Sequence, residues 1–203
     1  SEISTLRKLS EYIKERATEF YEKEVNWSEI IEEVPVRKTN SGWIARAFRL
    51  PILLILKLYF RLKTVDKKKL TGKQVIFVSN HQSFIDALVV AGVFPAKILK
   101  KTSFLAIDLY FKKGLMKYIA ENANIVVIDI NNNIKHTIEE ITNALKQGRN
   151  ILIFPEGART KDGKVSQFKK VFAILAKELN ISVQCIGIKG AFEAYSRYMK
   201  FPK

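Results

Sequence analysis

Two side chains that can handle a proton stand five positions apart in residues 80–86, which read Asn-His-Gln-Ser-Phe-Ile-Asp. The neutral imidazole of His81 can accept a proton near neutral pH. The carboxylate of Asp86 can fix the tautomer of that imidazole and stabilise the imidazolium that forms. The pair predicts a general base with an orienting acid.

The sequence offers no nucleophile to accompany this pair. It contains no Gly-x-Ser-x-Gly stretch, and its one cysteine, Cys185, lies far from His81 in the chain. The base would then activate a hydroxyl of the substrate, which indicates transfer of a group to an alcohol. An alternative stays open, because Ser83-x-x-Asp86 is also a capping-box pattern that satisfies free amides at a helix start.

An apolar run precedes each of two polar motifs, and each run predicts a buried strand. Residues 75–78 (Val-Ile-Phe-Val) lead into the motif of His81, and residues 150–154 (Asn-Ile-Leu-Ile-Phe) lead into residues 155–160 (Pro-Glu-Gly-Ala-Arg-Thr). Helical patterns separate the two strands, so we expect them to be parallel, with their carboxyl ends at one edge of a sheet. Ligands of open α/β sheets bind at that edge. The two motifs are expected to meet in one cleft.

The whole pattern predicts an α/β fold with a mixed, largely parallel sheet flanked by helices and an N-terminal amphipathic helical appendage. Cys185 falls in the last expected strand, where a buried structural thiol is the expectation. The other expected elements are a helix over 88–93, a strand and turn over 96–101, a strand over 125–130, helices over 134–145 and 171–179, and a strand over 182–188.

The two motifs together resemble those of the glycerolipid acyltransferase family, which includes lysophosphatidic acid and glycerol-3-phosphate acyltransferases. The matching residues are Asn80-His81-x4-Asp86 and Phe154-Pro155-Glu156-Gly157-x-Arg159-Thr160. The resemblance covers residues 42–203 and implies that His81 and Asp86 are catalytic. It also implies a set of substrate-binding residues: Asn80, Ser83, Glu156, Gly157, Arg159 and Thr160. The alternatives are a solvated loop arginine for Arg159 and a helix or turn cap for Glu156.

The chain departs from the family pattern at several positions. Ala158 stands where the family usually has threonine, and Thr160 where it has serine. The family often has an arginine after a strand between the motifs, whereas the strand expected over 125–130 runs into three asparagines. The Phe-Lys-x-Gly stretch of the family appears as residues 168–171 without its glycine. The head group of the acceptor is therefore left open.

The resemblance implies a reaction between an acyl thioester, carried by coenzyme A or acyl carrier protein, and the hydroxyl of a lysophospholipid or glycerophosphate. His81 would take the hydroxyl proton, and donors near Gly157 or a bound water would stabilise the oxyanion. Arg159 would bind the acceptor's phosphate. These thioesters are co-substrates, and no further cofactor or metal is expected. The alternative function is a catalytically inactive lipid- or carrier-binding module of the same fold.

Charge is unevenly spread along the 203 residues, whose formal net charge is +15. Residues 1–40 hold seven basic and nine acidic residues, while the remainder holds 28 basic and 11 acidic ones. The shift predicts a boundary between a helical appendage and linker (1–41) and the acyltransferase domain (42–203), with a C-terminus that is expected to be truncated. A basic domain attracts anionic partners. The chain shows no nucleic-acid-binding signature, so no nucleic-acid partner is expected.

Residues 1–13 are similar to the last helix of acyl carrier domains, which implies that the chain is part of a larger acyl-activating fusion protein. Residues 43–63 predict a basic amphipathic helix that lies in a membrane interface. Its expected membrane contacts are Trp43, Arg46, Arg49, Lys57 and Arg61, with Pro51 kinking the helix or starting a second one. The expected location is the cytoplasmic face of a membrane, peripheral or monotopic. The alternative is a helix packed on the sheet with a solvated basic edge.

Overall fold

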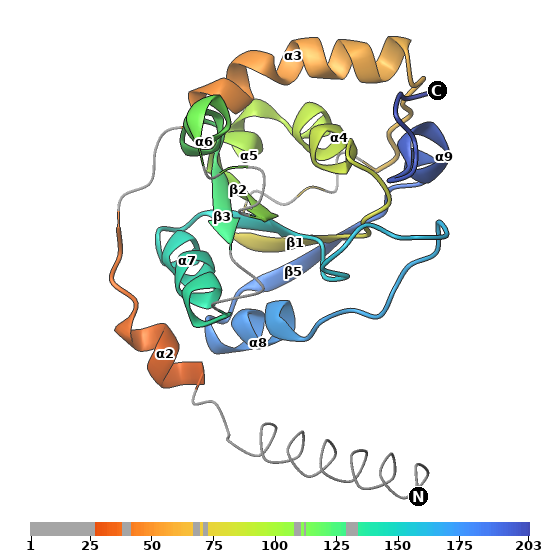
Figure 1. The fold of residues 1–203 in the computed structure, drawn as a ribbon. Helices are drawn as coiled ribbons and strands as arrows, with labels where there is room; N and C mark the ends of the chain where they lie inside the picture. Colours follow the sequence, from red (N-terminus) through yellow and green to blue (C-terminus); the bar gives the residue numbers. More distant parts are fainter. Residues whose placement is uncertain are drawn as a thin grey trace, which may run out of the picture.

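A five-stranded sheet lies at the centre of the protein in the computed structural model, with helices on both faces (Figure 1). The structure describes residues 27–37, 42–66, 70, 73–107, 111, 113–128 and 134–203. The strands are β1 (Val75–Ser79), β2 (Thr102–Ile107), β3 (Ile125–Ile128), β4 (Asn150–Ile153) and β5 (Ser182–Ile186). Their order is β3-β2-β4-β1-β5, and every neighbouring pair is parallel. The predicted α/β fold is therefore confirmed, with a sheet that is parallel throughout.

Helices cover both faces of the sheet (Figure 1). They are α2 (Trp27–Glu33), α3 (Trp43–Leu58), α4 (Asp86–Val93), α5 (Ala96–Lys101), α6 (Gly114–Asn122), α7 (Ile134–Lys146), α8 (Val171–Glu178) and α9 (Ala191–Tyr195). In Figure 1, α3 crosses above α4 and α5 on one side, while α7 and α8 lie on the other. Because both faces are covered, the strands read as continuous apolar runs.

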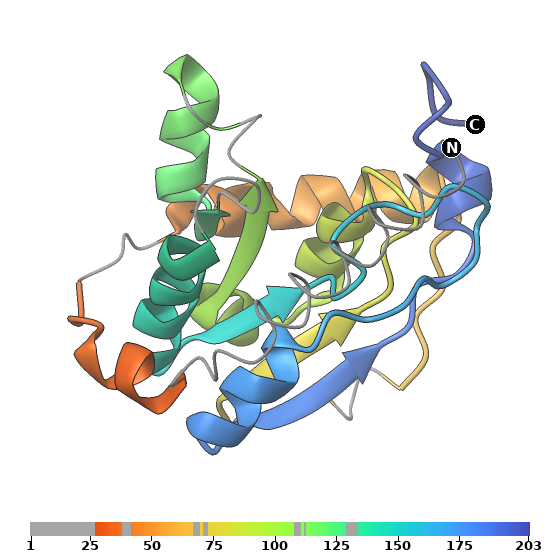
Figure 2. The ribbon, with the colours of Figure 1, turned by 60° about the horizontal axis from the view of Figure 1, so that its bottom comes forward.

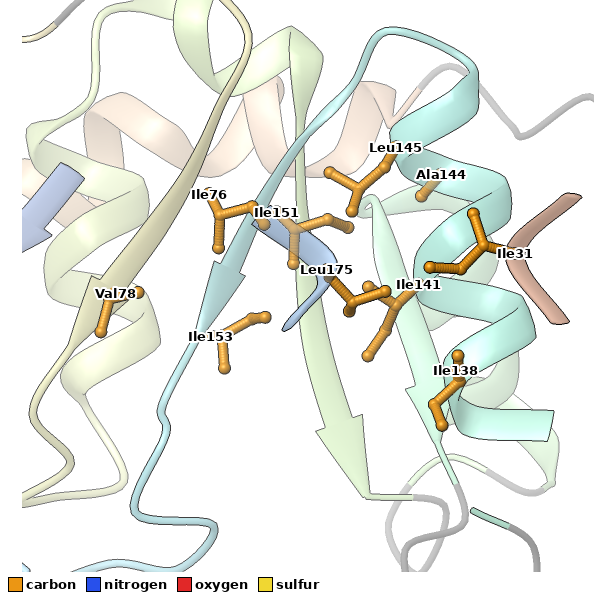
Figure 3. Close-up of a cluster of buried hydrophobic side chains, with 10 residues drawn as sticks. All are labelled: Ile31, Ile76, Val78, Ile138, Ile141, Ala144, Leu145, Ile151, Ile153 and Leu175. Atoms are coloured by element: carbon orange, nitrogen blue, oxygen red, sulfur yellow. The ribbon is translucent and has the colours of Figure 1, made fainter. Parts of the chain in front are cut away.

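Alternate residues of the central strands feed two separate hydrophobic clusters. In β1, Val75 and Phe77 pack toward α4 and α5, whereas Ile76 and Val78 pack toward α7 and α8. Figure 3 shows the second cluster between the sheet and the helices α7, α8 and α2. Its buried members are Ile31, Ile76, Val78, Ile138, Ile141, Ala144, Leu145, Ile151, Ile153 and Leu175. The strands that carry the two polar motifs are thus the most firmly buried in the molecule.

Two expectations from the sequence are wrong. Residues 96–101 form the helix α5 and not a strand, because the Pro95 carbonyl accepts the amides of Ile98 and Leu99 and closes a helical turn. Cys185 is exposed and not buried. Its strand, β5, is one of the two edge strands of the sheet, so fewer neighbours cover the side chains that it presents.

The helix α3 continues through Pro51 and ends at Leu58, so the proline neither breaks it nor starts a second helix. Leu56 on its inner face is buried. Its outer face leaves large apolar side chains in solvent: Trp43, Phe48, Leu50, Leu54, Ile55 and Leu58. In the part of the chain that the structure describes, this and every other helix falls short of the length and apolar character needed to cross a membrane.

The described part of the N-terminal appendage packs against α7 and α8. Ile31 and Val34 are buried, and the Lys146 ammonium donates to the carbonyl oxygens of Glu32 and Val34. The resemblance to an acyl carrier helix falls on residues 1–13, which lie outside the described residues. The proposed domain boundary at residue 41 likewise stays a prediction.

Candidate active site

The first motif occupies the loop between β1 and α4, at the carboxyl edge of the sheet. His81 Nδ1 donates to Asp86 Oδ2 across 2.8 Å, and the Asp86 side chain is fully buried. The same oxygen accepts the backbone amides of Gln82 (2.6 Å) and Ser83 (2.7 Å). Because Nδ1 is the donor, the neutral ring keeps its lone pair on Nε2, as a general base requires.

Asp86 also serves the structural role that a capping box predicts, but only in part. Its carboxylate reaches back to the amide of Ser83, which is half of the reciprocal pattern. The Ser83 hydroxyl oxygen accepts the Ile85 amide at 3.3 Å, and the hydroxyl donates to the carbonyl oxygen of Tyr195 in α9. One carboxylate thus orders the turn and orients the imidazole, so the two interpretations of this motif are compatible.

The His81 ring lies flat against Phe154, the residue that follows β4. The ring centroids are 4.2 Å apart and the planes differ by 19°. The His81 side chain remains 23% exposed. Stacking on one face and hydrogen bonding at Nδ1 leave the ring fixed in orientation while it stays open to a substrate.

Two residues of the second motif form hydrogen bonds with the backbone amide and carbonyl of His81. Glu156 Oε1 accepts the His81 amide at 2.7 Å, and the Thr160 amide donates to the His81 carbonyl at 2.8 Å. The other carboxylate oxygen, Glu156 Oε2, accepts the amide of Ser166 at 2.8 Å. The two motifs therefore lie side by side, as the sequence predicts, and Glu156 is the clamp between them.

Replacing Glu156 by alanine is expected to lower the free energy of unfolding by about 2–4 kcal/mol, because two amides lose a charged acceptor. The catalytic rate should fall as well, since the His81 backbone loses its clamp. Urea unfolding followed by circular dichroism measures the first effect. Glu178→Ala, on the outer side of α8, is the matched control and should change stability by less than about 0.5 kcal/mol. Equal stability of the two variants would rule out the clamp.

The remaining residues of the second motif lie at the rim of the site. Gly157 adopts φ +73°, and its amide donates to the Phe154 carbonyl at 3.0 Å. The guanidinium carbon of Arg159 sits 3.2 Å from the centroid of the Phe84 ring, in a cation–π stack with the first motif. Phe84 is a site residue that sequence reasoning missed, although its place inside the motif and its large apolar side chain were visible.

Three other candidate residues use their side chains to hold loops in place. The Asn80 amide both donates to and accepts from the backbone of Ile188, at 2.7 Å each, which ties the end of β5 to the motif. Ser83 is bonded to α9, and the Thr160 hydroxyl donates to Asp162 at 3.1 Å. Their assignment to substrate binding stays a prediction. The place of the missing arginine, residues 129–133, lies outside the described residues.

The turn after the second motif contains the carboxylate of Asp162, which hydrogen bonds within the turn stabilise. The Lys164 amide, and then the Thr160 hydroxyl, lower the pKa of the Asp162 carboxyl below its ordinary value. The stabilisation is present above the ordinary pKa of an aspartate and is lost as pH falls through the lowered value. The turn that follows Arg159 therefore keeps its shape at neutral pH.

The predicted membrane-contact residues do not share one role. Arg49 Nε donates to the Phe94 carbonyl at 2.5 Å. Trp43 Nε1 donates to Asn122 Oδ1 at 3.1 Å, although Trp43 stays 46% exposed. Arg46 is half-buried and Lys57 is exposed. Arg61 lies beyond the end of α3 and has φ 51°, so it does not share the helical face that was expected for it.

The described residues contain no group of three or more histidine, cysteine, aspartate or glutamate side chains placed to hold a metal ion. What the structure does assemble is a histidine with an oriented ring, a buried carboxylate behind it and the second motif, with Arg159, beside it. This arrangement suits proton transfer from a hydroxyl that belongs to a substrate.

Comparisons with known proteins agree with this arrangement. The profile of the family described as Acyltransferase matches residues 61–189, which is more than half of the chain. The chain is 29% identical over 123 residues to a 1-acyl-sn-glycerol-3-phosphate acyltransferase of Chlamydomonas reinhardtii. It is 28% identical over 116 residues to a chloroplastic one of Arabidopsis thaliana, and 26% identical over 137 residues to one of Cocos nucifera.

These matches cover 59%, 57% and 66% of this chain but only 36%, 32% and 43% of the relatives, so the chain spans less than half of their length. The crystal structure of the 1-acyl-sn-glycerophosphate acyltransferase PlsC from Thermotoga maritima has a similar fold, with a TM-score of 0.56 and 25% identity. That similarity covers 77% of this chain and 64% of the other. The profile match, these relatives and the two joined motifs show that the chain belongs to the glycerolipid acyltransferase family.

Proposed function

We propose that the protein transfers a fatty acyl group from a thioester, on coenzyme A or acyl carrier protein, to the hydroxyl of a lysophospholipid or glycerophosphate. The observation that carries this proposal is the bond from His81 Nδ1 to the buried Asp86, which leaves Nε2 as the free base. The relatives named above are acyltransferases whose names specify 1-acyl-sn-glycerol 3-phosphate, which favours a phosphorylated acceptor.

The reaction follows from these positions. His81 Nε2 takes the proton of the acceptor hydroxyl, and the oxygen attacks the thioester carbonyl. The C–O bond forms, the C–S bond breaks, and the thiolate leaves with the electron pair of the C–S bond. A thiol has a pKa of about 8.5, so the thiolate leaves readily and takes its proton from the imidazolium or from water. Asp86 stabilises the imidazolium while it carries the proton.

Release of free thiol from a long-chain acyl-CoA, with and without an acceptor, tests the proposal. We expect release that depends on 1-acylglycerol 3-phosphate, with ester formation confirmed by mass spectrometry. The assay is repeated with acyl carrier protein as donor. If neither donor yields ester with any lysophospholipid or with glycerol 3-phosphate, while the chain still binds them, the inactive binding module is the better interpretation.

We further propose that the outer face of α3 rests on a membrane surface. Its apolar side chains lie in solvent while its inner face packs on α4 and α5, as expected of a helix with its apolar side in an interface. At the C-terminal end of α3, the hydroxyl of Tyr59 donates to the Pro202 carbonyl at 3.2 Å. Figures 1 and 2 show α9 and the C-terminus beside this end of α3, and the Tyr195 carbonyl of α9 accepts the hydroxyl of Ser83 in the first motif.

The paired substitution Leu54→Glu and Leu58→Glu is expected to reduce sedimentation with vesicles of phosphatidylcholine and phosphatidylglycerol by at least about tenfold. The reason is that the two new glutamates would place negative charges in the lipid interface. These side chains are 58% and 72% exposed, so the fold should survive the change. Val36→Glu, at a residue that is 62% exposed outside α3, is the matched control. Equal sedimentation of both variants would contradict a membrane contact through α3.

A further inference from the structure

The side chain of Lys169 lies directly across Gly157 of the second motif. A Cβ placed on Gly157 would come within 2.8 Å of both Cε and Nζ of Lys169 and within 3.4 Å of its Cδ. Contacts of 2.8 Å are too short for a real Cβ. Glycine at this position, with φ +73°, therefore leaves the space in which the ammonium group sits.

The backbone around Lys169 is anchored to the same motif. The Lys169 amide donates to the Pro155 carbonyl at 2.9 Å, and the Ser166 amide donates to Glu156 at 2.8 Å. The segment that carries the lysine is thus fixed at two points on the turn that also clamps His81. Residues 165–169 form a loop in which Lys169 is exposed, and these two bonds hold the loop against the turn.

This ammonium has no carboxylate to neutralise it within the described residues. Both oxygens of Glu156 accept backbone amides, and the Asp162 carboxylate is bonded within its own turn. Five cationic side chains stand between Pro155 and Lys170, against these two carboxylates: Arg159, Lys161, Lys164, Lys169 and Lys170. The rim of the site is therefore electropositive and suited to an anion.

Four backbone amides near this rim already donate hydrogen bonds within the protein. The Gly157 amide donates to Phe154, and the His81 amide donates to Glu156. The amides of Gln82 and Ser83 donate to Asp86. An anion that enters beside Gly157 can take a hydrogen bond from the Lys169 ammonium, which the turn holds there.

We propose that Lys169 is a specificity-determining residue that binds the phosphate group of the acceptor, over Gly157. This inference rests on the proposed function. An ammonium–phosphate contact is a charge-assisted hydrogen bond, which is stronger than a neutral one. Gly157 is bonded to Phe154, the residue on which the His81 ring stacks, so a phosphate at this point places the rest of the acceptor next to the base.

The test compares Lys169→Met with Lys170→Met, a neighbouring exposed lysine, on two acceptors that differ only in phosphate. For 1-oleoylglycerol 3-phosphate, Lys169→Met is expected to raise KM by about 10- to 100-fold, the loss of one charged hydrogen bond. For 1-oleoylglycerol the same variant should change KM by less than threefold, whereas Lys170→Met should change neither by that much. Lys169→Arg should restore most of the affinity.

Equal losses with both acceptors, or no loss with either, would overturn the proposal. A second measurement does not need turnover: binding of 1-oleoylglycerol 3-phosphate in detergent micelles, compared between His81→Ala and the double variant His81→Ala with Lys169→Met. Weaker binding by the double variant supports the phosphate contact, and equal binding rejects it. If the wild-type chain transfers no acyl group, the proposed function fails while this binding result still decides the role of Lys169.

Discussion

Replacing His81 by alanine is expected to lower kcat by about 10²- to 10⁴-fold, the usual contribution of a general base. The KM for the acceptor should change little, because the ring acts on the hydroxyl proton while other groups hold the head group. The fold should persist, since the backbone bonds of residue 81 to Glu156 and Thr160 do not depend on its side chain. Acceptor-dependent thiol release measures the effect.

His136 provides the matched control for this substitution, because it is the second of the two histidines in the chain. It lies on α7, its side chain is 47% exposed, and it sits 3.8 Å from Glu139 on the same helix. His136→Ala should keep at least half of the wild-type rate. Activity of His81→Ala close to that of the control would refute a catalytic histidine at this site.

Replacing Asp86 by asparagine is the second large effect, with an expected loss in kcat of about 10²- to 10⁴-fold. The amide oxygen of asparagine can still take the place of Oδ2, but the negative charge that stabilises the imidazolium is gone. Asp86 Oδ1 is buried and has no hydrogen-bond partner among the described residues, so the amide nitrogen of asparagine would lie there with its two hydrogens unsatisfied. We therefore also expect a loss of stability of about 1–3 kcal/mol.

Kinetics and unfolding must be measured together for this variant. Asp162→Asn makes the same chemical change on the exposed turn after the second motif, and it should retain activity within about threefold. Folded Asp86→Asn protein with wild-type kcat would show that the carboxylate only orders the turn. Loss of kcat in a folded variant would show that the carboxylate also serves the imidazole.

Four of the five strands and the meeting of the two motifs could be predicted from the sequence, because these strands are short apolar runs rich in β-branched residues. The strand β2 was missed, and a strand was expected instead over 96–101. The bond between His81 and Asp86 was likewise within reach, since the two residues share one turn. The clamp by Glu156 was not, because a glutamate in a polar loop does not reveal which amide it will accept. The contact of Ser166 with that carboxylate carried no signal in the sequence at all.

The wrong predictions for residues 96–101, Cys185 and Arg61 have a common cause. Residues 96–101 alternate weakly between apolar and basic side chains, and a run of six cannot distinguish a helix from a strand. Burial of Cys185 depends on whether its strand is central or at an edge, which is a property of sheet order and not of local sequence. Arg61 was assigned to a helical face because the end of α3 has no strong stop signal. Tertiary neighbours decide each of these cases.

The placement of β1 beside β4 separates the chain into parts with different freedom to change. The two motifs are joined by hydrogen bonds between neighbouring strands, although β2 and β3 and their helices lie between them in the sequence. The intervening stretch begins after α4 and ends at β4, and it contains α5, β2, α6, β3 and α7. The connections between the elements of that stretch can change in length without moving His81 relative to Glu156. Its buried side chains cannot be exchanged so freely, because Phe104 of β2 and Ile141 of α7 belong to the two clusters that hold the sheet. The fold thus behaves as a fixed reaction unit in which the intervening connections are the parts free to vary.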